Sequence, residues 1–374
     1  MRIGVPTEIK SNEFRVGLVP ASVREITAYG HEVVVQTGAG AGIFADDAAY
    51  LKAGARILPT AEAVFAEADM IVKVKEPQAI EYKRLQPHQI LFTYLHLAPD
   101  PDQARGLLAS GATAIAYETV TDAQGGLPLL APMSEVAGRL SIEAAAMALR
   151  RPSGGRGVLM GGVPSVKPAK VVVLGGGVVG THAARMAAGL GADVTIIDRS
   201  LPRLRQLDEL FEGRVRTLAS TLESIETEVF AADAVIGAVL VPGASAPKLV
   251  TRDMLKEMKK GAVLVDVAID QGGCFETSYP TTHAEPTYEI DGIIHYCVAN
   301  MPGAVPVTSA QALNNATLPF VLKLAHKGLA ALDDDKHLAA GLNVRAGRIM
   351  HSAVASSLGF DRLGEAKPFA LAAE

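Results

Sequence analysis

The chain has 374 residues, 49% of them hydrophobic, which is enough to bury two separate cores. Its formal net charge of −5, with no Lys/Arg block, excludes nucleic acid as an expected partner. The apolar runs are strand-sized and the start MRIGVPTEIK lacks an apolar signal region, so we expect a cytoplasmic protein without membrane spans. Cys274 and Cys297 lack metal-ligand spacing, so we expect no metal site.

The first part of the chain alternates short apolar strands with helical stretches. The expected strands are RIGVPT, HEVVVQ, MIVKVKEP, ILFTYLHL and TAIAYE, and one intervening helix starts near Pro20. This alternation predicts a parallel α/β domain. After the turn GGLPLLAP, the stretch MSEVAGRLSIEAAAMALRR predicts a long helix with Ser134 as its N-cap.

Residues 170–199, KVVVLGGGVVGTHAARMAAGLGADVTIIDR, predict a dinucleotide-binding unit. A strand runs into Gly175, Gly177 and Gly180, and a helix follows whose N-terminus suits phosphate groups. A second strand ends at Asp198, whose carboxylate would accept hydrogen bonds from the adenosine ribose. An acid there repels a 2′-phosphate, so the pattern favours NAD over NADP, although Arg199 is adjacent.

Further strands follow Asp198, and a polar helix is expected over TRDMLKEMKKG. The stretch MPGAVP then breaks the chain, and Thr308 with Gln311 predicts a capping box for a late helix that returns to the first domain. The expected fold is α/β with two mostly parallel sheets wrapped by helices. A Rossmann NAD domain, residues 134–305, is inserted into a substrate domain of residues 1–133 and 306–374, with a cleft between them.

Three polar residues of the first domain lie where a substrate would be bound, close to strand ends. Arg15 follows the first strand and could clamp a carboxylate, or could simply be a surface arginine. Lys75 closes MIVKVKEP on the same face as Lys73, where both lysines could instead guard an edge strand. His96 ends ILFTYLHL and could exchange protons near neutral pH, or could be structural.

In the second domain, Asp270 ends VLVDVAID before two glycines, again at the carboxyl end of a strand. Asp266 lies between valines inside that strand and is expected to be a buried acid with satisfied hydrogen bonds. The acidic and histidine residues of THAEPTYE lack zinc-site spacing and predict a polar loop.

Several motifs together resemble the alanine dehydrogenase family. They are GVPTEIKSNEFRVGLVP, VKVKEP, YLHLA, GGGVVGTHAARMAAGLGADVTIID, VDVAIDQGG and VANMPGAVPVTSAQALNNATLPF, in order from residue 1 to about residue 360. The resemblance implies a cytosolic, NAD-dependent, homohexameric enzyme. Such an enzyme interconverts L-alanine, water and NAD with pyruvate, ammonium and NADH.

The resemblance also implies roles for single residues. Arg15 and Lys75 would hold the substrate carboxylate and polarise its oxygen, His96 would be the acid/base, and Asp270 would orient water and steady the iminium intermediate. Arg203 stands where relatives commonly carry a lysine near the adenosine. The full set of implied cofactor contacts is Ser134, Gly175, Gly177, Val178, Gly180, Asp198, Arg203, Ser220, Val239, Leu240, Val267, Val298, Asn300 and Met301.

Three alternatives share parts of this pattern. The NAD-binding subunit of a proton-translocating transhydrogenase has the same fold but needs no substrate lysine and histidine. A catalytically silent NAD-binding protein would have lost turnover, which the four polar positions argue against. A saccharopine dehydrogenase relative would need a more open cleft for its larger substrate.

Overall fold

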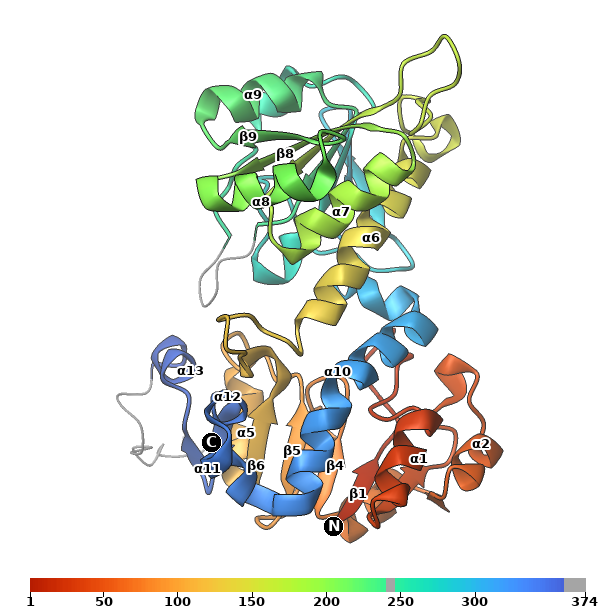
Figure 1. Cartoon of the computed structure of the whole chain (residues 1–374), viewed down its shortest axis with the longest axis vertical. Coiled ribbons are helices and arrows are strands. Elements are labelled where there is room, and N and C mark those ends of the chain that lie inside the picture. The colour runs from red at the N-terminus through yellow and green to blue at the C-terminus, as the bar shows by residue number, and fades with distance from the viewer. Residues whose placement is uncertain (240–245, 360–374) are drawn as a thin grey trace, which may run out of the picture. The chain divides into compact units, whose positions relative to one another are not determined.

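The computed structural model describes residues 1–239 and 246–359, and the chain divides into two compact units (Figure 1). Unit 1 comprises Met1–Pro132 and the chain from Val305 onward, and unit 2 comprises Met133–Ala304. Unit 2 is therefore an insertion into the sequence of unit 1. The chain leaves unit 1 through helix α6 (Ala131–Ala148) and returns through α10 (Pro306–Lys327).

Unit 1 is built on one sheet with the strand order β15-β14-β6-β5-β4-β1-β2-β3. Strands β1 to β6 pair in parallel, whereas β14 and β15 are antiparallel additions at one edge. The strand bounds are Arg2–Val5, Glu32–Gln36, Arg56–Leu58, Met70–Val72, Ile90–Thr93 and Thr113–Ala116 for β1 to β6, and Leu342–Arg345 and Arg348–Ile349 for β14 and β15.

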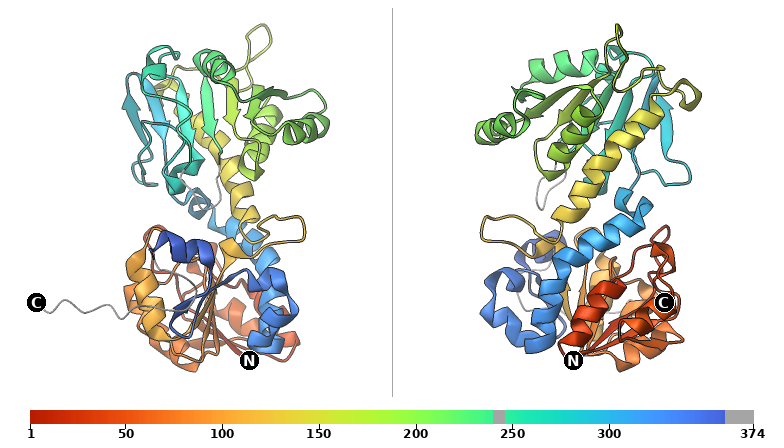
Figure 2. Two further views of the ribbon diagram at one scale, coloured as in Figure 1. Left: turned by 90° about the vertical axis from the view of Figure 1, so that its left-hand side faces the viewer. Right: turned by 45° about the vertical axis from the view of Figure 1, so that its right-hand side comes forward.

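Helices cover the sheet of unit 1, and Figure 2 shows them from two further directions. Residues at alternate positions of the strands, such as Ile71 and Leu91, pack in one core cluster against α3 and α5. The helices of unit 1 besides α10 are α1 (Pro20–Ala28), α2 (Asp47–Lys52), α3 (Ala61–Glu67), α4 (Ala79–Tyr82), α5 (Pro101–Ser110), α11 (Ala331–Asp334), α12 (Lys336–Ala339) and α13 (Ser352–Ser357).

Unit 2 has the strand order β12-β13-β11-β10-β7-β8-β9, in which only β12 is antiparallel among the described strands. Its strands β7 to β13 are Lys170–Leu174, Asp193–Asp198, Arg216–Ala219, Ala234–Gly237, Val263–Asp266, Thr287–Ile290 and Ile293–Tyr296. Its helices besides α6 are α7 (Val178–Gly189), α8 (Leu201–Phe211) and α9 (Leu222–Ala231). This is the doubly wound order of dinucleotide-binding domains.

The apolar run of β7 explains why the sheet of unit 2 carries a core on both faces. Val171 and Val173 pack in one cluster with residues of α6 and α7, whereas Val172 and Leu174 pack in another with residues of α9. Successive strand residues point to opposite faces, so a continuous apolar run is what a doubly covered strand requires. The prediction of two α/β domains with mostly parallel sheets is confirmed.

Three local predictions are wrong. Helix α6 begins at Ala131, so Ser134 lies inside its first turn rather than at the N-cap. Helix α10 begins at Pro306 with Val305 as its N-cap, so Thr308 and Gln311 do not form the expected capping box. In both places a proline, which fits the first helical turn, lies upstream of the polar residue that suggested the cap. The stretch 251–261 contains only a short 3-10 helix, Asp253–Lys256.

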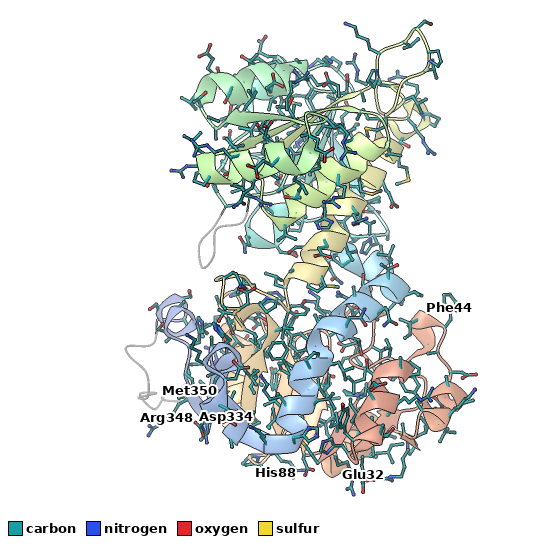
Figure 3. All side chains as sticks on the ribbon, viewed as in Figure 1. Glu32, Phe44, His88, Asp334, Arg348 and Met350 are labelled. Carbon is teal, nitrogen blue, oxygen red and sulfur yellow. The ribbon has the colours of Figure 1, made fainter. Side chains whose placement is uncertain are left out.

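No helix in the described part of the chain is long and apolar enough to span a membrane. Side chains cover both units, and Figure 3 labels Glu32 and His88 at the edge of unit 1 where its parallel strands begin. The residues of functional interest follow the carboxyl ends of the strands, at the opposite edge of the same sheet.

Candidate active site

Each unit has one point where the order of its parallel strands reverses. In unit 1 the first strand, β1, pairs with β2 on one side and β4 on the other. In unit 2 the first strand, β7, pairs with β8 and β10. Ligands of open α/β sheets bind beyond the carboxyl ends of strands at such a switch point, so these two edges are the candidate binding sites.

Arg15, in the segment after β1, is only 3% exposed, so the alternative of a surface arginine is wrong. Its Nε donates to Glu13 Oε1 at 2.6 Å, and its Nη2 donates to Glu13 Oε2 at 2.5 Å. The same carboxylate accepts the backbone N–H of Arg15 at 3.0 Å. A guanidinium has five N–H donors, so this fork fixes the side chain without using all of its hydrogen-bonding capacity.

The two lysines after β4 have different surroundings. Lys73 is fully buried and pairs with Glu8 at 3.1 Å and Glu81 at 2.8 Å, whereas Lys75 is partly exposed. Glu8 also accepts the backbone N–H groups of Val74 at 2.6 Å and of Lys75 at 3.3 Å. Strand β4 lies between β1 and β5, so neither lysine guards an edge strand.

His96 follows β5 with a strained backbone, because its φ of +46° lies in the left-handed region. Glu118, which follows β6, holds this conformation by accepting the N–H of His96 at 2.6 Å and of Leu95 at 3.1 Å. The imidazole stacks on Tyr94 with ring centroids 5.7 Å apart. The Tyr94 hydroxyl in turn donates to the carbonyl oxygen of Leu129 at 2.6 Å.

The imidazole of His96 faces a second carboxylate. Its Nδ1 lies 3.7 Å from Oε2 of Glu76, and Lys10 pairs with the other oxygen of that carboxylate. Burial favours neutral His96, but the carboxylates of Glu118 and Glu76 outweigh it and raise the pKa of His96. The side chain is 43% exposed, so solvent screens part of this attraction. The result is a histidine ring that is biased toward its charged form.

Sequence reasoning missed the four carboxylates that hold these groups in place: Glu8, Glu13, Glu76 and Glu118. Two of them carried a usable signal, since Glu76 and Glu118 lie at the ends of expected strands, as Lys75 and His96 do. The other two lie in the loop after β1. Glu13 is only two positions from its partner Arg15, whereas Glu8 reaches partners that no short motif indicates. Glu8 and Lys73, for example, are 65 positions apart.

In unit 2 the glycine turn between β7 and α7 has the shape expected for a phosphate cradle. Gly175 has a φ of +101°, and a Cβ there would lie 2.6 Å from the carbonyl oxygen of Ala238. A Cβ at Gly180 would overlap the carbonyl oxygen of Gly175, whereas one at Gly177 would meet no atom within 4 Å. No side chain caps α7 at Gly177, so the positive end of the helix is left for an anion.

Asp198 ends β8 beside this turn. Its Oδ2 accepts the N–H of Gly176 at 2.7 Å, and its Oδ1 accepts the N–H of Ser200 at 2.8 Å. Arg203 on α8 donates from Nε to the carbonyl oxygen of Gly176 at 2.7 Å and from Nη2 to Thr181 Oγ1 at 2.8 Å. Each carboxylate oxygen keeps a lone pair for a ribose hydroxyl, and Arg203 braces the turn.

The other expected cofactor contacts come from many elements of unit 2. Val178 is the first residue of α7, and the N–H of Ser220 after β9 donates to the carbonyl oxygen of Asp198 at 3.0 Å. Leu240 lies outside the described residues. The remaining positions are Ser134 in the first turn of α6, Val239 after β10, Val267 after β11, and Val298, Asn300 and Met301 after β13. Carboxyl ends of parallel strands share one edge of a sheet, so the strand-end residues of this set lie at a common edge.

Asp266 and Asp270, both near the end of β11, differ sharply. Asp266 is fully buried and accepts hydrogen bonds from Ser278 Oγ and from backbone N–H groups, which confirms the expected satisfied acid. Burial raises its pKa, and these hydrogen bonds act in the opposite direction. Asp270 is exposed in the 3-10 helix Val267–Gln271, and its side chain makes no hydrogen bond or ion pair with the described residues.

The described residues contain no group of three or more His, Cys, Asp or Glu side chains that would hold a metal ion. Cys274 and Cys297 are buried free thiols, and burial raises the pKa of both.

Comparison with known proteins places this geometry in context. A model of the alanine dehydrogenase/PNT N-terminal domain matches residues 4–137, and one of the corresponding C-terminal domain matches residues 141–352. An alanine dehydrogenase of Halomonas elongata is 59% identical over 362 residues, which cover 96% of this chain and 98% of that protein. A solved L-alanine dehydrogenase superimposes with a TM-score of 0.93 at 55% identity, covering 96% of this chain and 99% of the other. A transhydrogenase from Sinorhizobium meliloti follows with a TM-score of 0.82 at 26% identity, covering 94% of this chain and all of that one.

Proposed function

The chain belongs to the alanine dehydrogenase/PNT family, and from this premise we propose that it interconverts L-alanine and pyruvate with NAD. In the oxidative direction, L-alanine, water and NAD give pyruvate, ammonium, NADH and a proton. The observation that carries the proposal is the set of three polar side chains, Arg15, Lys75 and His96, that follow the strands around the switch point of unit 1. Unit 1 would then be the substrate domain, and unit 2 the NAD domain.

The glycine turn of unit 2 fits a dinucleotide. The uncapped α7 would receive the pyrophosphate, the open side of Gly177 leaves room for it, and Asp198 would accept hydrogen bonds from the ribose. When bound, NAD supplies a hydride acceptor for the α-carbon of the substrate. A ribose-binding carboxylate disfavours the 2′-phosphate of NADP, so NAD is the proposed partner.

In unit 1, Arg15 and Lys75 would bind the substrate through its oxygen atoms. The guanidinium of Arg15 is already oriented by Glu13, so binding a carboxylate costs little further ordering of that side chain. Lys75 would polarise the carbonyl oxygen of pyruvate, with its backbone held by Glu8. Two cations on one small substrate orient its α-hydrogen for transfer.

His96 would move the protons. Oxidation of alanine passes through an iminium that water attacks, and protons leave at two stages near neutral pH, which suits an imidazole. Glu76 and Glu118 stabilise the protonated ring and so prepare it to return a proton in the reverse direction. Asp270 would orient the attacking water and stabilise the cationic iminium by its negative charge.

Neither rival function is favoured. A transhydrogenase-type subunit would have no use for Lys75 and His96, and the transhydrogenase comparison stands at 26% identity against 59% for an alanine dehydrogenase. A silent NAD-binding protein would not need the carboxylates that hold Arg15 and His96 in place. The protein is further proposed to be a cytoplasmic homohexamer, by family resemblance, and light scattering of the purified protein tests the assembly.

The test of function is the absorbance of NADH when purified protein is mixed with NAD and a panel of L-amino acids. We expect turnover with L-alanine, and reoxidation of NADH with pyruvate and ammonium. Lys75→Met should abolish both, whereas Lys83→Met, at an exposed position of the same unit, should leave them intact. No turnover with any amino acid, together with tight NADH binding, would instead support a silent or transhydrogenase-type protein.

A further inference from the structure

The segment that carries Asp270 is held by the side chain of Asp266. The carboxylate of Asp266 accepts the N–H of Ala268 at 3.2 Å, of Cys274 at 2.9 Å and of Phe275 at 3.3 Å, and the hydroxyl of Ser278 at 2.5 Å. It therefore contacts the segment on both sides of Asp270. One buried side chain closes the turn 267–275 into a loop of fixed shape.

Two glycines leave the space that this carboxylate occupies. A Cβ on Gly273, whose φ is +74°, would lie 2.6 Å from Asp266 Oδ2. A Cβ on Gly237 of β10 would lie 3.1 Å from Asp266 Oδ1 and would overlap Cys274 Sγ. The glycines, one in β10 and one in the turn after β11, thus permit a close approach of backbone to carboxylate.

Lys248 holds the same segment from outside. Its Nζ donates to the carbonyl oxygens of Gly272 at 2.5 Å, Gly273 at 2.9 Å and Phe275 at 3.2 Å. The N–H groups of residues 274 and 275 point to Asp266, whereas carbonyl oxygens of residues 272, 273 and 275 point to Lys248. The backbone is consequently fixed by an anion on one side and a cation on the other.

The side chain of Asp270 makes no hydrogen bond or ion pair with the described residues, so no side-chain contact of its own fixes its place. Its location depends on the backbone of the 3-10 helix Val267–Gln271, which Asp266 caps. We propose that Asp266 is a positioning residue that places Asp270 for the reaction, with Lys248 as its counterpart. This inference rests on the role proposed above for Asp270.

Substitution of Asp266 by asparagine tests the inference. Asparagine keeps the shape of the side chain but replaces one carboxylate oxygen by an amide N–H₂. That group is a donor and would face the N–H and O–H donors around position 266, so the turn must shift. A misplacement of about 1 Å can lower a rate by roughly 10²-fold, and we expect a decrease of that order in kcat for alanine, with NADH affinity within about threefold of the original. A purely structural role predicts a lower melting temperature and an unchanged kcat per folded molecule.

A double-variant cycle sharpens the test. If Asp266 acts through Asp270, then Asp266→Asn should lower kcat much less in an Asp270→Asn background than in the unmodified enzyme. If the decrease in kcat of the double variant equals the product of the decreases of the two single variants, the residues act independently and the inference is overturned. If Asp266→Asn does not fold, Lys248→Met replaces it in the same cycle, because Lys248 is exposed and its loss leaves the core intact.

The matched control is Asp233→Asn. Asp233 is also a buried acid of unit 2, but it precedes β10 at the opposite edge of the sheet. Its partners are the N–H of Lys170 at 2.8 Å, Lys259 Nζ at 3.1 Å and Arg156 Nε at 3.1 Å. We expect it to lower stability and to leave kcat per folded molecule unchanged. If Asp233→Asn lowered kcat as much as Asp266→Asn does, then replacing a buried acid of unit 2 at either position would lower kcat. That result would contradict a positioning role for Asp266.

Hydrogen exchange separates this inference from the proposed function. Amides 268–275 should exchange faster in Asp266→Asn and in Lys248→Met than in the unmodified protein, whatever reaction the enzyme catalyses. Unchanged exchange in both variants would overturn the inference even if alanine is the substrate. A protein that fails to oxidise alanine, yet shows the faster exchange, would refute the proposed function alone.

Discussion

The first five strands of each unit have the same order, but the residues that follow the strands at the switch point differ in chemistry between the two units. In unit 1 the strands around the switch point lead into Arg15, Lys75 and His96, each charged or able to become charged. In unit 2 the first strand leads into glycines, and what it presents is bare backbone at the start of a helix. The order of the strands thus fixes where a ligand binds, and the residues after each strand determine which ligand.

Carboxylates hold functional groups in both units, but the glycine turn of unit 2 adds close backbone packing. Unit 1 uses carboxylates, since Glu13 binds the Arg15 side chain and Glu118 the backbone of His96. In the turn of unit 2, Asp198 and Arg203 hold the backbone of Gly176. A Cβ at Gly180 would overlap the carbonyl oxygen of Gly175, so backbone packs directly on backbone there. Substitutions in unit 1 should therefore affect turnover, and those in the turn of unit 2 should affect cofactor binding.

The largest effect is expected in unit 1 from His96→Ala. Loss of a general acid/base should lower kcat by roughly 10²–10⁴-fold, while NADH binding, followed by fluorescence, stays nearly unchanged. Asp270→Asn should also impair turnover. A His96→Ala protein that melts at a lower temperature but turns over normally per folded molecule would rule out the catalytic role and point to Lys75 as the base.

A smaller effect is expected from substitution of the glycines of unit 2. Gly177 and Gly180 should differ in whether substitution weakens cofactor binding or lowers stability. Gly177→Ala places a methyl group in open space, so stability should stay within about 0.5 kcal/mol while NADH binds roughly tenfold more weakly. Gly180→Ala pushes a Cβ into the Gly175 carbonyl and should cost about 1–3 kcal/mol of unfolding free energy. Calorimetry measures the stability of the two variants, and NADH titration measures their affinity for the cofactor. Equal destabilisation by the two variants would contradict the proposal that Gly177 leaves open space for a phosphate group.

Cofactor preference should depend on Asp198. The unmodified enzyme should use NAD at least tenfold more efficiently than NADP, because an uncompensated charge contact costs about 1.4 kcal/mol or more. Asp198→Ala should narrow that gap, measured as the ratio of kcat/KM values. Equal kinetics with both cofactors in the unmodified enzyme would instead assign Arg199 and Arg203 to a phosphate site.

The sequence predicts the unit 2 turn more completely than the unit 1 site. Strand, glycines, helix and acid lie within 30 consecutive residues, so a local pattern contains the whole turn. In unit 1 the residues after strands could be found singly, but their partners could not, because Glu118 and His96 are 22 positions apart and meet only when β5 pairs with β6. The short 3-10 helix Asp253–Lys256 was missed because polar helical spacing does not reveal how few turns the surroundings allow.

The smallest effect is expected from the carboxylate of Glu76 beside His96. Its pH dependence follows from the directions in which the pKa values of Glu76 and His96 are shifted. The pKa of His96 is raised, so its stabilising contribution is complete below about pH 6.5 and is lost as the pH rises through the folded-state value. Burial alone would raise the pKa of Glu76, but His96, Lys75 and Lys10 hold it well below its ordinary value. The contribution of Glu76 is therefore present above about pH 4.3 and is lost as the pH falls through its folded-state value.

Glu76→Gln removes one of the charges that favour protonated His96, so the imidazole should lose its proton at lower pH. The acidic limb of kcat/KM for alanine oxidation, with a midpoint above about pH 6.5 in the unmodified enzyme, should move down by roughly half a pH unit to one unit. The variant should also lose more stability at about pH 6 than at pH 9, because the ion pair with His96 exists only while the ring is charged. Glu67→Gln, a partly exposed acid of the same unit, is the matched control and should leave the limb in place. A limb that stays fixed in Glu76→Gln, or moves to higher pH, would show that Glu76 does not set the proton affinity of His96.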